Sequence, residues 1–232
     1  MINFAHRGAS EYAPENTVLS FSLGLIMGAN GIETDVRKSK DGVLYLYHDD
    51  TVDRMTDGIG NVTGRTYSEL YKLNVIKNGL TDKILSFENF LKAFSHQDII
   101  FAIETKEVGL EKELIAMLDK YYMKKKTTIT SFEFESIKNC KKIDPTYQVG
   151  YLVEELNDKV ILDLKSIGGE EICPEAKLLT PEITNNLKAQ GLRVRAWGIY
   201  SEKEMIHAIK CGVYGMTVNF PDKLKKYLDD NK

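Results

Sequence analysis

Residues 36–48 read VRKSKDGVLYLYH, and this stretch decides how the strand-like segments of the chain are counted. An apolar segment ends at Val36 and an alternating one, Val43–Tyr47, follows after a handful of residues that include Asp41-Gly42. A parallel crossover needs a dozen or more residues, whereas Asp-Gly between alternating segments is typical of a hairpin turn. We therefore predict that Val43–Tyr47 runs antiparallel to the end of the preceding strand.

Outward from this hairpin, strand-like and helix-like segments alternate along the chain. The other strand candidates are Ile2–Ala5, Gly31–Val36, Ile99–Glu104, Thr127–Ser131, Val149–Val153, Glu170–Cys173, Leu192–Trp197 and Gly215–Val218. Helical patterns cover Asn16–Ala29, Phe87–Ser95, Leu110–Met123, Glu133–Lys141, Pro181–Gln190, Glu202–Cys211 and Pro221–Asp229, and Asn30-Gly31 supplies a left-handed stop for the first. Repeated strand–helix units indicate a parallel sheet covered by helices.

With the hairpin strand set aside, eight parallel strands remain, which favours a TIM (β/α)₈ barrel over a doubly wound sheet. The length of 232 residues is close to the ~250 typical of such barrels. We predict one domain, 1–232, with a β-hairpin excursion and a small insertion after strand two, at about 37–86. Within it, Asp49–Leu85 is irregular and lacks core periodicity, which is typical of a lid or insertion.

Composition excludes several classes of protein. The chain has 31 basic and 34 acidic residues, a net charge of −3, without the basic excess of a nucleic-acid-binding protein. No run of 18 apolar residues occurs, so we expect no stable membrane insertion. Cys140, Cys173 and Cys211 are far apart and odd in number, which argues against a disulfide framework or a thiolate metal site. We expect reduced core cysteines and a cytoplasmic location.

Charged side chains gather at the carboxyl ends of the predicted strands, where TIM barrels build their active sites. They are His6, Arg7, Glu33, Asp35, His48, Glu104 and Lys106. Each has an ordinary alternative, such as a surface turn, a solvent-facing strand or a same-face ion pair of little value. Glu104 is the hardest to explain in that way, because it follows an apolar strand buried on both faces. A carboxylate there requires a partner or a metal.

In order and spacing, these residues resemble the glycerophosphodiester phosphodiesterase family over nearly the whole chain. The matching motifs are His6-Arg7-Gly8, Ala13-Pro14-Glu15-Asn16-Thr17, Glu33-x-Asp35, His48-Asp49 and Glu104-x-Lys106, with Trp197, Gly212-Val213-Tyr214-Gly215 and Phe220-Pro221 later. The resemblance implies a TIM barrel with a small insertion. It also implies one divalent cation, Ca²⁺ or Mg²⁺, held by Glu33, Asp35 and Glu104.

The same resemblance implies roles for the remaining residues. His6 and His48 would be an acid/base pair, and Arg7 and Lys106 would contact the phosphate. From its position at the end of a strand, Trp197 would lie either in the core or in the wall of the substrate pocket. The chain departs from the family pattern at Gly198-Ile199-Tyr200, where Thr-Val-Asn is usual, at Asn219, where Asp is usual, and at Tyr214, where Asp is common. These departures concern the pocket wall and substrate preference rather than the chemistry.

The chemistry of the residues agrees with this interpretation. Carboxylates without a thiolate form a hard oxygen site, which favours Mg²⁺ or Ca²⁺, and two histidines supply both proton-transfer forms near neutrality. We predict metal-dependent hydrolysis of a small-molecule glycerophosphodiester to sn-glycerol 3-phosphate and an alcohol. Two alternatives are a phospholipase D-like lipid phosphodiesterase and a non-catalytic phosphodiester-binding barrel. The sequence leaves open which alcohol headgroup is preferred and which of the two histidines is the base. It also leaves open whether the reaction passes through a cyclic phosphate or by direct attack of water, and what the oligomeric state is.

Overall fold

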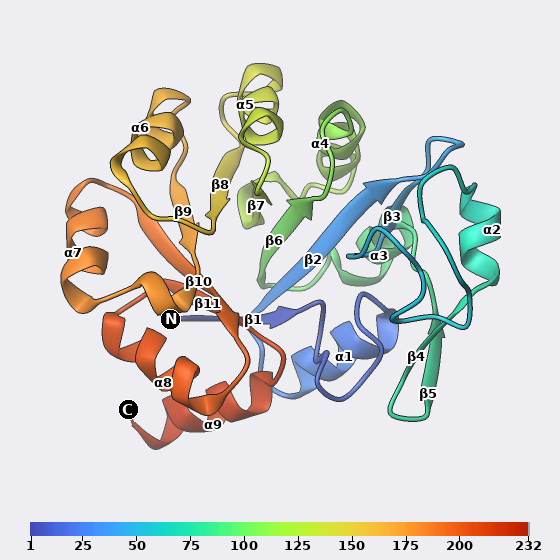
Figure 1. Ribbon diagram of the computed structural model, residues 1–232, viewed down its shortest axis with the longest axis horizontal. Helices are drawn as coiled ribbons and strands as arrows, with labels where there is room; N and C mark the ends of the chain where they lie inside the picture. Colours follow the sequence, from blue (N-terminus) through green and yellow to red (C-terminus); the bar gives the residue numbers. More distant parts are fainter. Residues whose placement is uncertain (232) are drawn as a thin grey trace.

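Parallel strands form a closed ring in the computed structural model, which describes residues 1–231 (Figure 1). In this range eight of them follow one another as β1, β2, β6, β7, β8, β9, β10 and β11, and β11 pairs with β1 again. Their bounds are Ile2–His6, Gly31–Lys38, Ile100–Thr105, Thr127–Ser131, Gln148–Val153, Glu171–Pro174, Arg193–Ile199 and Gly215–Val218. The predicted TIM barrel is confirmed.

Helices surround the barrel on its outside (Figure 1). They are α1 (Val18–Ile26), α3 (Phe87–Phe94), α4 (Glu111–Lys120), α5 (Phe134–Ile143), α6 (Asp158–Ser166), α7 (Pro181–Ala189), α8 (Glu202–Cys211) and α9 (Pro221–Asp230), with single 3₁₀ turns at Lys124–Lys126 and Ala176–Leu178. The sequence patterns did not reveal α6, which buries only Leu164. The first helix ends earlier than predicted, because Gly28 at φ +89° takes the left-handed position while Gly31 opens β2.

The hairpin prediction is confirmed. Strand β3 (Leu44–Leu46) pairs antiparallel with the end of β2, placing Val36 opposite Leu46 and Lys38 opposite Leu44. Gly42 has φ +84° in the connecting turn. The hairpin therefore extends beyond the barrel wall and carries His48 back toward the barrel mouth.

The segment after the hairpin is more regular than we expected. It contains α2 (Tyr67–Lys72) and an antiparallel pair, β4 (Asn74–Lys77) and β5 (Leu80–Lys83), which lie beside the barrel in Figure 1. It also has its own hydrophobic cluster, formed by Tyr45, Tyr47, Val52, Met55, Val62, Leu70, Val75 and Ile84. The segment lacks a long hydrophobic period, yet its apolar residues, which are spread over short elements, still form this cluster.

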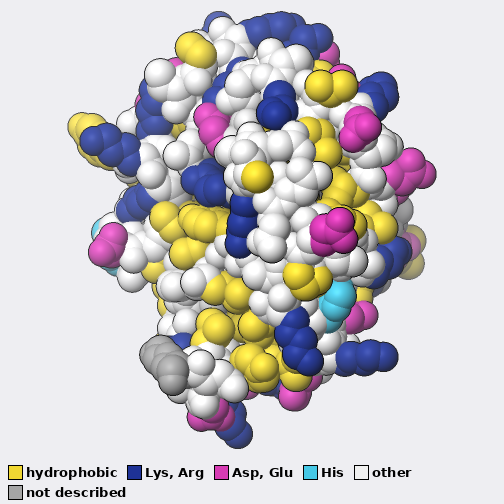
Figure 2. All heavy atoms as spheres, turned by 90° about the vertical axis from the view of Figure 1, so that its left-hand side faces the viewer, with side chains coloured by type: hydrophobic (Ala, Val, Ile, Leu, Met, Phe, Trp, Pro, Cys, Tyr) yellow, Lys and Arg dark blue, Asp and Glu magenta, His cyan; other side chains and the backbone are white. Residues whose placement is uncertain are grey.

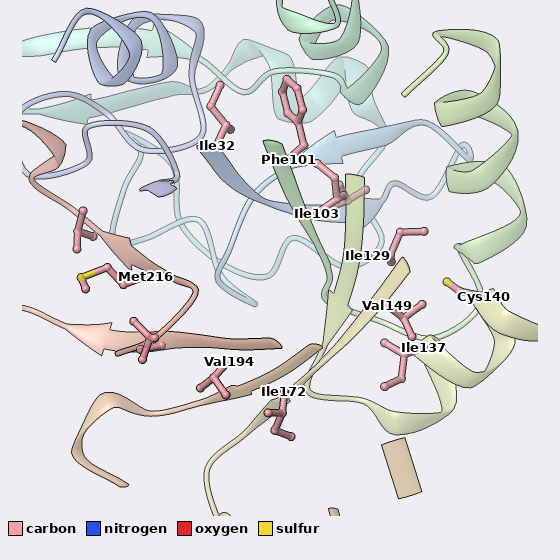
Figure 3. Close-up of a cluster of buried hydrophobic side chains, with 14 of the residues drawn as sticks. Ile32, Phe101, Ile103, Ile129, Ile137, Cys140, Val149, Ile172, Val194 and Met216 are labelled. Carbon is pink, nitrogen blue, oxygen red and sulfur yellow. The ribbon is translucent and has the colours of Figure 1, made fainter. Parts of the chain in front are cut away.

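The main hydrophobic core lies between the barrel wall and the helices. Figure 3 shows Ile129 and Val149 pointing from neighbouring strands toward Ile137 and Cys140 of α5. Successive strand residues alternate between the two faces, so the residues between these apolar ones point into the barrel. That alternation aims the polar side chains of β2, β6 and β10 inward.

Phe4 closes the lower end of the barrel. Its ring lies beside Gly31 and Gly215, where an added Cβ atom would stand 2.6 Å and 2.9 Å from ring carbons of Phe4. The guanidinium of Arg195 lies 5.3 Å from the centre of the same ring. The interior is therefore filled below the polar layer and opens at the carboxyl ends of the strands.

On the face turned to the viewer in Figure 2, basic and acidic side chains are interspersed with small apolar groups. This face is the left-hand side of Figure 1, where α6, α7 and α8 lie. Charge of one sign is therefore not gathered there into a single patch. Among residues 1–231, no helix has the length and apolar character needed to cross a bilayer.

Candidate active site

The predicted site residues meet at the mouth of the barrel. A cavity of about 420 Å³ is lined there by His6, Arg7, Glu33, His48, Glu104, Lys106 and Trp197, together with other side chains of β7, β8, β10 and their loops. Asp35 does not line it, because its side chain is fully buried behind the cavity wall. The structure thus brings all of the candidates together, with Asp35 behind the others.

Three carboxylates converge at the base of this cavity. Glu33, Asp35 and Glu104 each offer an oxygen atom, and these atoms lie within 4.8 Å of one another. The barrel register explains this, because Asp35 of β2 stands opposite Glu104 of β6. Asp35 Oδ1 is buried and accepts no hydrogen bond within the described chain, and Lys106 Nζ lies 3.8 Å from it. The group therefore has the donor atoms and the unsatisfied oxygen of a hard cation site.

Burial and mutual repulsion shift the pKa values of these carboxyls in opposite directions. Burial, reinforced by the charges of Asp35 and Glu104, raises the pKa of Glu33 well above its usual range. Burial and Asp35 also raise the pKa of Glu104. For Asp35, burial alone would raise the pKa, but the charges of Arg7 and Lys106 lower it below its usual range. A bound cation would favour the charged forms of Glu33 and Glu104 and would therefore compete with protons for these two groups.

Asn16 holds the deepest carboxylate in place. Its amide nitrogen donates to Asp35 Oδ2 at 2.9 Å, and its amide oxygen accepts from Thr34 Oγ1 at 2.7 Å. Asn16 has φ +58°, a left-handed conformation that asparagine tolerates better than most residues. The next residue, Thr17, caps α1 by accepting from Ser20 N. The turn that begins α1 therefore also supports the acidic cluster.

His6 is held through its Nδ1 atom. Nδ1 lies 2.6 Å from Asn219 Oδ1, which also accepts a hydrogen bond from Ser10 Oγ at 2.9 Å. Nε2 faces Glu33 Oε2 at 3.9 Å. Burial and the nearby charge of Arg7 lower the pKa of His6 to about 3, so the ring is neutral at neutral pH. Sequence reasoning noted Asn219 only as a departure and missed this contact.

Arg7 is paired with acidic groups on two sides. Its Nε lies 3.0 Å from Asp35 Oδ2 and its Nη1 donates to Glu15 Oε1 at 3.0 Å. Burial opposes the charge, but Asp35 and Glu15 raise the pKa of Arg7 further, so it stays cationic. Gly8 follows at φ +87°, and an added Cβ atom would stand 2.4 Å from the Ser20 backbone carbon. Only glycine allows the chain to turn there against α1.

His48 lies across the cavity at the end of the hairpin. Its Nδ1 is 2.6 Å from Asp49 Oδ1, and Arg37 Nη2 donates to its backbone carbonyl at 2.8 Å. Arg54, from the insertion, donates to both Asp49 and Glu15. The insertion thereby ties the His48 side of the site to the Arg7 side. Arg37 and Arg54 were missed, since no local motif links them to the site.

Lys106 and Arg195 place further positive charge around the acidic cluster. Lys106 Nζ donates to Glu104 Oε1 at 2.6 Å. Burial opposes this charge, but Asp35 and Glu104 raise the pKa of Lys106. Beneath them Arg195, only 1% exposed, donates to Glu171 Oε1 at 2.8 Å and to Thr217 Oγ1 at 3.0 Å. The sequence did not single out Arg195 or Glu171, because their pairing across β9 and β10 depends on the barrel.

Trp197 forms part of the cavity wall. Its Nε1 donates to the Cys173 carbonyl at 2.9 Å, and its ring packs edge to face on Phe132 with centroids 5.2 Å apart. The register of β10 against β11 shifts between Ala196 and Ile199, and Gly198 has φ +72°. An added Cβ atom at Gly198 would stand 2.7 Å from Glu175 Cγ. The departure at Gly198 therefore corresponds to a bulge in the cavity wall.

Comparisons with known proteins agree on one family. The profile described as "Glycerophosphoryl diester phosphodiesterase family" matches residues 6–223. A glycerophosphodiester phosphodiesterase of Caldanaerobacter subterraneus subsp. tengcongensis is 32% identical over 95% of this chain and 94% of its own.

Solved structures show the same fold. A putative glycerophosphoryl diester phosphodiesterase from Silicibacter pomeroyi superposes with a TM-score of 0.90 at 22% identity, over 98% of this chain and 92% of that one. An Oleispira antarctica phosphodiesterase, solved in complex with the product sn-glycerol-3-phosphate, gives a TM-score of 0.86 at 26% identity, over 97% and 96% of the two chains.

Proposed function

The chain belongs to the glycerophosphoryl diester phosphodiesterase family and is a phosphodiesterase of that kind, and from this premise we propose that it hydrolyses glycerophosphodiesters by a metal-dependent, two-histidine mechanism. The products would be sn-glycerol 3-phosphate and an alcohol. The observation that carries the proposal is the convergence of His6, His48 and the carboxylates on one cavity. The product bound by the Oleispira antarctica relative supports the choice of substrate.

The acidic cluster fits one divalent cation, Ca²⁺ or Mg²⁺. Glu33, Asp35 and Glu104 supply hard oxygen ligands, and Asp35 Oδ1 accepts no hydrogen bond in the described structure. When bound, the cation would supply charge stabilisation to the phosphoryl oxygens and to a nearby hydroxyl or water. Asn16 keeps Asp35 oriented for this role.

His6 and His48 would transfer the protons. In His6, the hydrogen bond from Nδ1 to Asn219 leaves Nε2 facing the cavity, free to exchange a proton. In His48, Asp49 holds Nδ1 and leaves the other ring nitrogen available. The two rings line the same cavity. One removes the proton of the nucleophile, and the other protonates the alkoxide that leaves.

Arg7 and Lys106 would bind the phosphate. Both line the cavity beside the acidic cluster, and both are held cationic by the surrounding carboxylates. With a cation of charge +2 and three carboxylates, these two groups bring the site to a net charge of +1. A singly charged phosphodiester then neutralises it, whereas a phosphomonoester dianion would leave an excess of negative charge.

The proposal is tested by incubation with glycerophosphocholine, with and without EDTA, and by assay of choline and sn-glycerol 3-phosphate. We expect both products, and their loss in EDTA. Release of choline from lysophosphatidylcholine instead would favour a phospholipase D-like activity. Undiminished hydrolysis after EDTA treatment would overturn the metal dependence.

The histidine pair is tested separately. His6→Ala and His48→Ala should each lower kcat by roughly 10²–10⁴-fold with little change in KM, and the double variant should lose less than the product of the two. A diester with an acidic leaving group should rescue the variant that lacks the general acid. His207→Ala, a change in the outer helix α8, is the control. Near-normal kcat in either single variant would overturn the two-histidine mechanism.

A further inference from the structure

Several cavities open at the mouth of the barrel. The first is the site cavity of about 420 Å³. The second, of about 370 Å³, is lined by Arg37, Asp50, Ser131 and Glu133, among others. His48, Glu104, Lys106 and Phe132 line both, and a further cavity shares His6, Arg7, His48 and Tyr200 with the first. A phosphodiester held at the residues common to the first two cavities has two substituents, and each of these two cavities can receive one.

The two cavities differ in chemistry. Charged and hydroxyl side chains dominate the second cavity, which suits the hydroxyls of the glycerol half. Aromatic side chains form the far wall of the first cavity: Phe132 after β7, and Trp197 and Tyr200 on or after β10. Phe132 and Trp197 meet at 85°, so their rings form a corner rather than a stack.

The bulge at Gly198 completes this aromatic wall. In a regular strand, alternate residues would face the barrel interior, yet the consecutive residues Trp197, Gly198, Ile199 and Tyr200 all line the cavity. The positive φ of Gly198 and the register shift after Ala196 account for the change. Tyr200 is thereby brought to the same cavity as Trp197.

One acidic side chain of this cavity lies outside the carboxylate cluster. Glu154, in the loop after β8, lines the cavity, and within residues 1–231 its carboxylate has no hydrogen-bond or ion-pair partner. The cationic groups of the cavity, Arg7, Lys106 and Arg195, are engaged with Asp35, Glu104 and Glu171. The cations of the cavity are therefore paired with carboxylates at its phosphate end, whereas the carboxylate of Glu154 is left without a cation beside the aromatic side chains.

We propose that this aromatic wall and Glu154 form a subsite for a cationic alcohol headgroup, either a quaternary ammonium or a primary amine. Aromatic faces attract such cations, and an unpaired carboxylate supplies the counter-charge. The subsite would favour diesters whose alcohol carries a positive charge over those with a neutral polyol. This inference rests on the proposed function and names the substrate class that the same site prefers.

The test compares kcat/KM for glycerophosphocholine with that for glycerophosphoglycerol, whose alcohol is neutral. We expect the wild-type enzyme to prefer the cationic diester, and Glu154→Gln to lower the ratio of the two values by roughly fivefold or more. Glu155→Gln is the matched control. Glu155 is the next residue, also lacks a partner in the described chain, and lines a neighbouring hollow rather than this cavity.

A second pair of variants tests the aromatic wall. Trp197→Leu should lower the same ratio, and Trp197→Phe, which keeps an aromatic face, should restore part of it. Tetramethylammonium chloride should inhibit glycerophosphoglycerol hydrolysis competitively, more strongly than sodium chloride at equal concentration, and less so in Glu154→Gln. This inhibition test reports directly on binding of the free tetramethylammonium cation, because the sodium chloride sample controls for ionic strength.

The outcomes separate this inference from the proposed function. If the wild type hydrolyses both diesters but the ratio is the same in Glu154→Gln, Trp197→Leu and Glu155→Gln, the cationic subsite is wrong and the phosphodiesterase proposal stands. If the ratio of the two kcat/KM values falls equally in Glu154→Gln and Glu155→Gln, the cause is a long-range charge effect, and the subsite is also wrong. If the wild type hydrolyses neither diester, both proposals fail.

Discussion

Asn219 fixes the hydrogen on His6: its Oδ1 atom lies 2.6 Å from His6 Nδ1 and also accepts from Ser10 Oγ. An amide oxygen only accepts hydrogen bonds, so Nδ1 carries the hydrogen and Nε2 has a free lone pair. A neutral partner orients the ring without adding the negative charge that an aspartate would bring. The departure from the family pattern at this position therefore bears directly on a candidate catalytic residue.

We predict that Asn219→Asp moves the acidic limb of the pH profile of kcat/KM to higher pH. A carboxylate beside Nδ1 favours the imidazolium form of His6, which has no lone pair on Nε2. Ser10→Ala is the control, because it removes the other partner of the same oxygen without adding charge. An acidic limb that stays in place in Asn219→Asp, or moves to lower pH, would contradict the prediction.

Cation binding should depend on Glu104. Glu104→Gln keeps the shape of the side chain but removes one of the converging charges, so we expect at least tenfold weaker binding of Ca²⁺ or Mg²⁺ by isothermal titration calorimetry. Glu113→Gln removes the same charge from a half-exposed position on α4 and should bind as the wild type does. Equal affinities in the two variants would remove Glu104 from the cation site.

The stabilisation conferred by a cation should grow with pH. The raised pKa values of Glu33 and Glu104 mean that, without a cation, the folded protein holds more protons at these groups than the unfolded chain does. Their contribution to stability therefore falls as pH rises above the usual glutamate value of about 4.5. A cation competes with these protons and binds better as they leave.

Thermal unfolding at one fixed, subsaturating cation concentration checks this prediction. The rise in Tm over an EDTA-treated sample should be larger at pH 7.5 than at pH 5. His6 contributes in the opposite direction, because its lowered pKa makes folding more favourable as pH rises from about 3. Comparing the cation-loaded sample with the EDTA-treated sample at the same pH cancels this contribution. A rise in Tm that is constant across this range would show that no proton is displaced.

Gly198→Ala should impair activity beyond its cost in stability. The substitution places a Cβ atom at a positive φ and 2.7 Å from Glu175 Cγ, so the bulge and the neighbouring Trp197 must shift. Gly191→Ala is the matched control, because Gly191 also has a positive φ but nothing lies within 4 Å of the added atom.

Both variants should lose about 1 kcal/mol or more in urea unfolding. Only Gly198→Ala should also change kcat/KM by several-fold. Parallel losses of activity in the two variants would show that the bulge does not shape the cavity.

The barrel and its hairpin could be predicted because their signals are local. Asp41-Gly42 and the short connection to Val43 are adjacent in sequence, and each barrel strand is a short segment bounded by loop or helix signals. The strand pair within the predicted insertion was missed, although Asn78-Gly79, between β4 and β5, is itself a hairpin signal. Its strands carry few apolar residues, so the turn had no periodic segments to flank it.

The site residues also divide into those with a local sequence signal and those without one. His6, Glu33 and Glu104 could be proposed because each ends or lies on a recognisable strand. Arg54 and Arg195 could not, because their carboxylate partners come from distant strands and loops that only the closed barrel brings near. Local sequence predicts which groups stand at the mouth, whereas the pairings that orient them are tertiary.

The ring of Phe4, packed between Gly31 and Gly215, fills the lower end of the barrel. The diester and both products of the proposed reaction would therefore pass through the opening at the mouth, which His48 and Tyr200 line. After cleavage the alcohol would have lost its link to the phosphate, while the phosphorylated half would keep its contacts with Arg7 and Lys106. On the proposed mechanism we therefore expect the alcohol to leave first and sn-glycerol 3-phosphate last. Added sn-glycerol 3-phosphate should then compete with the diester and slow turnover.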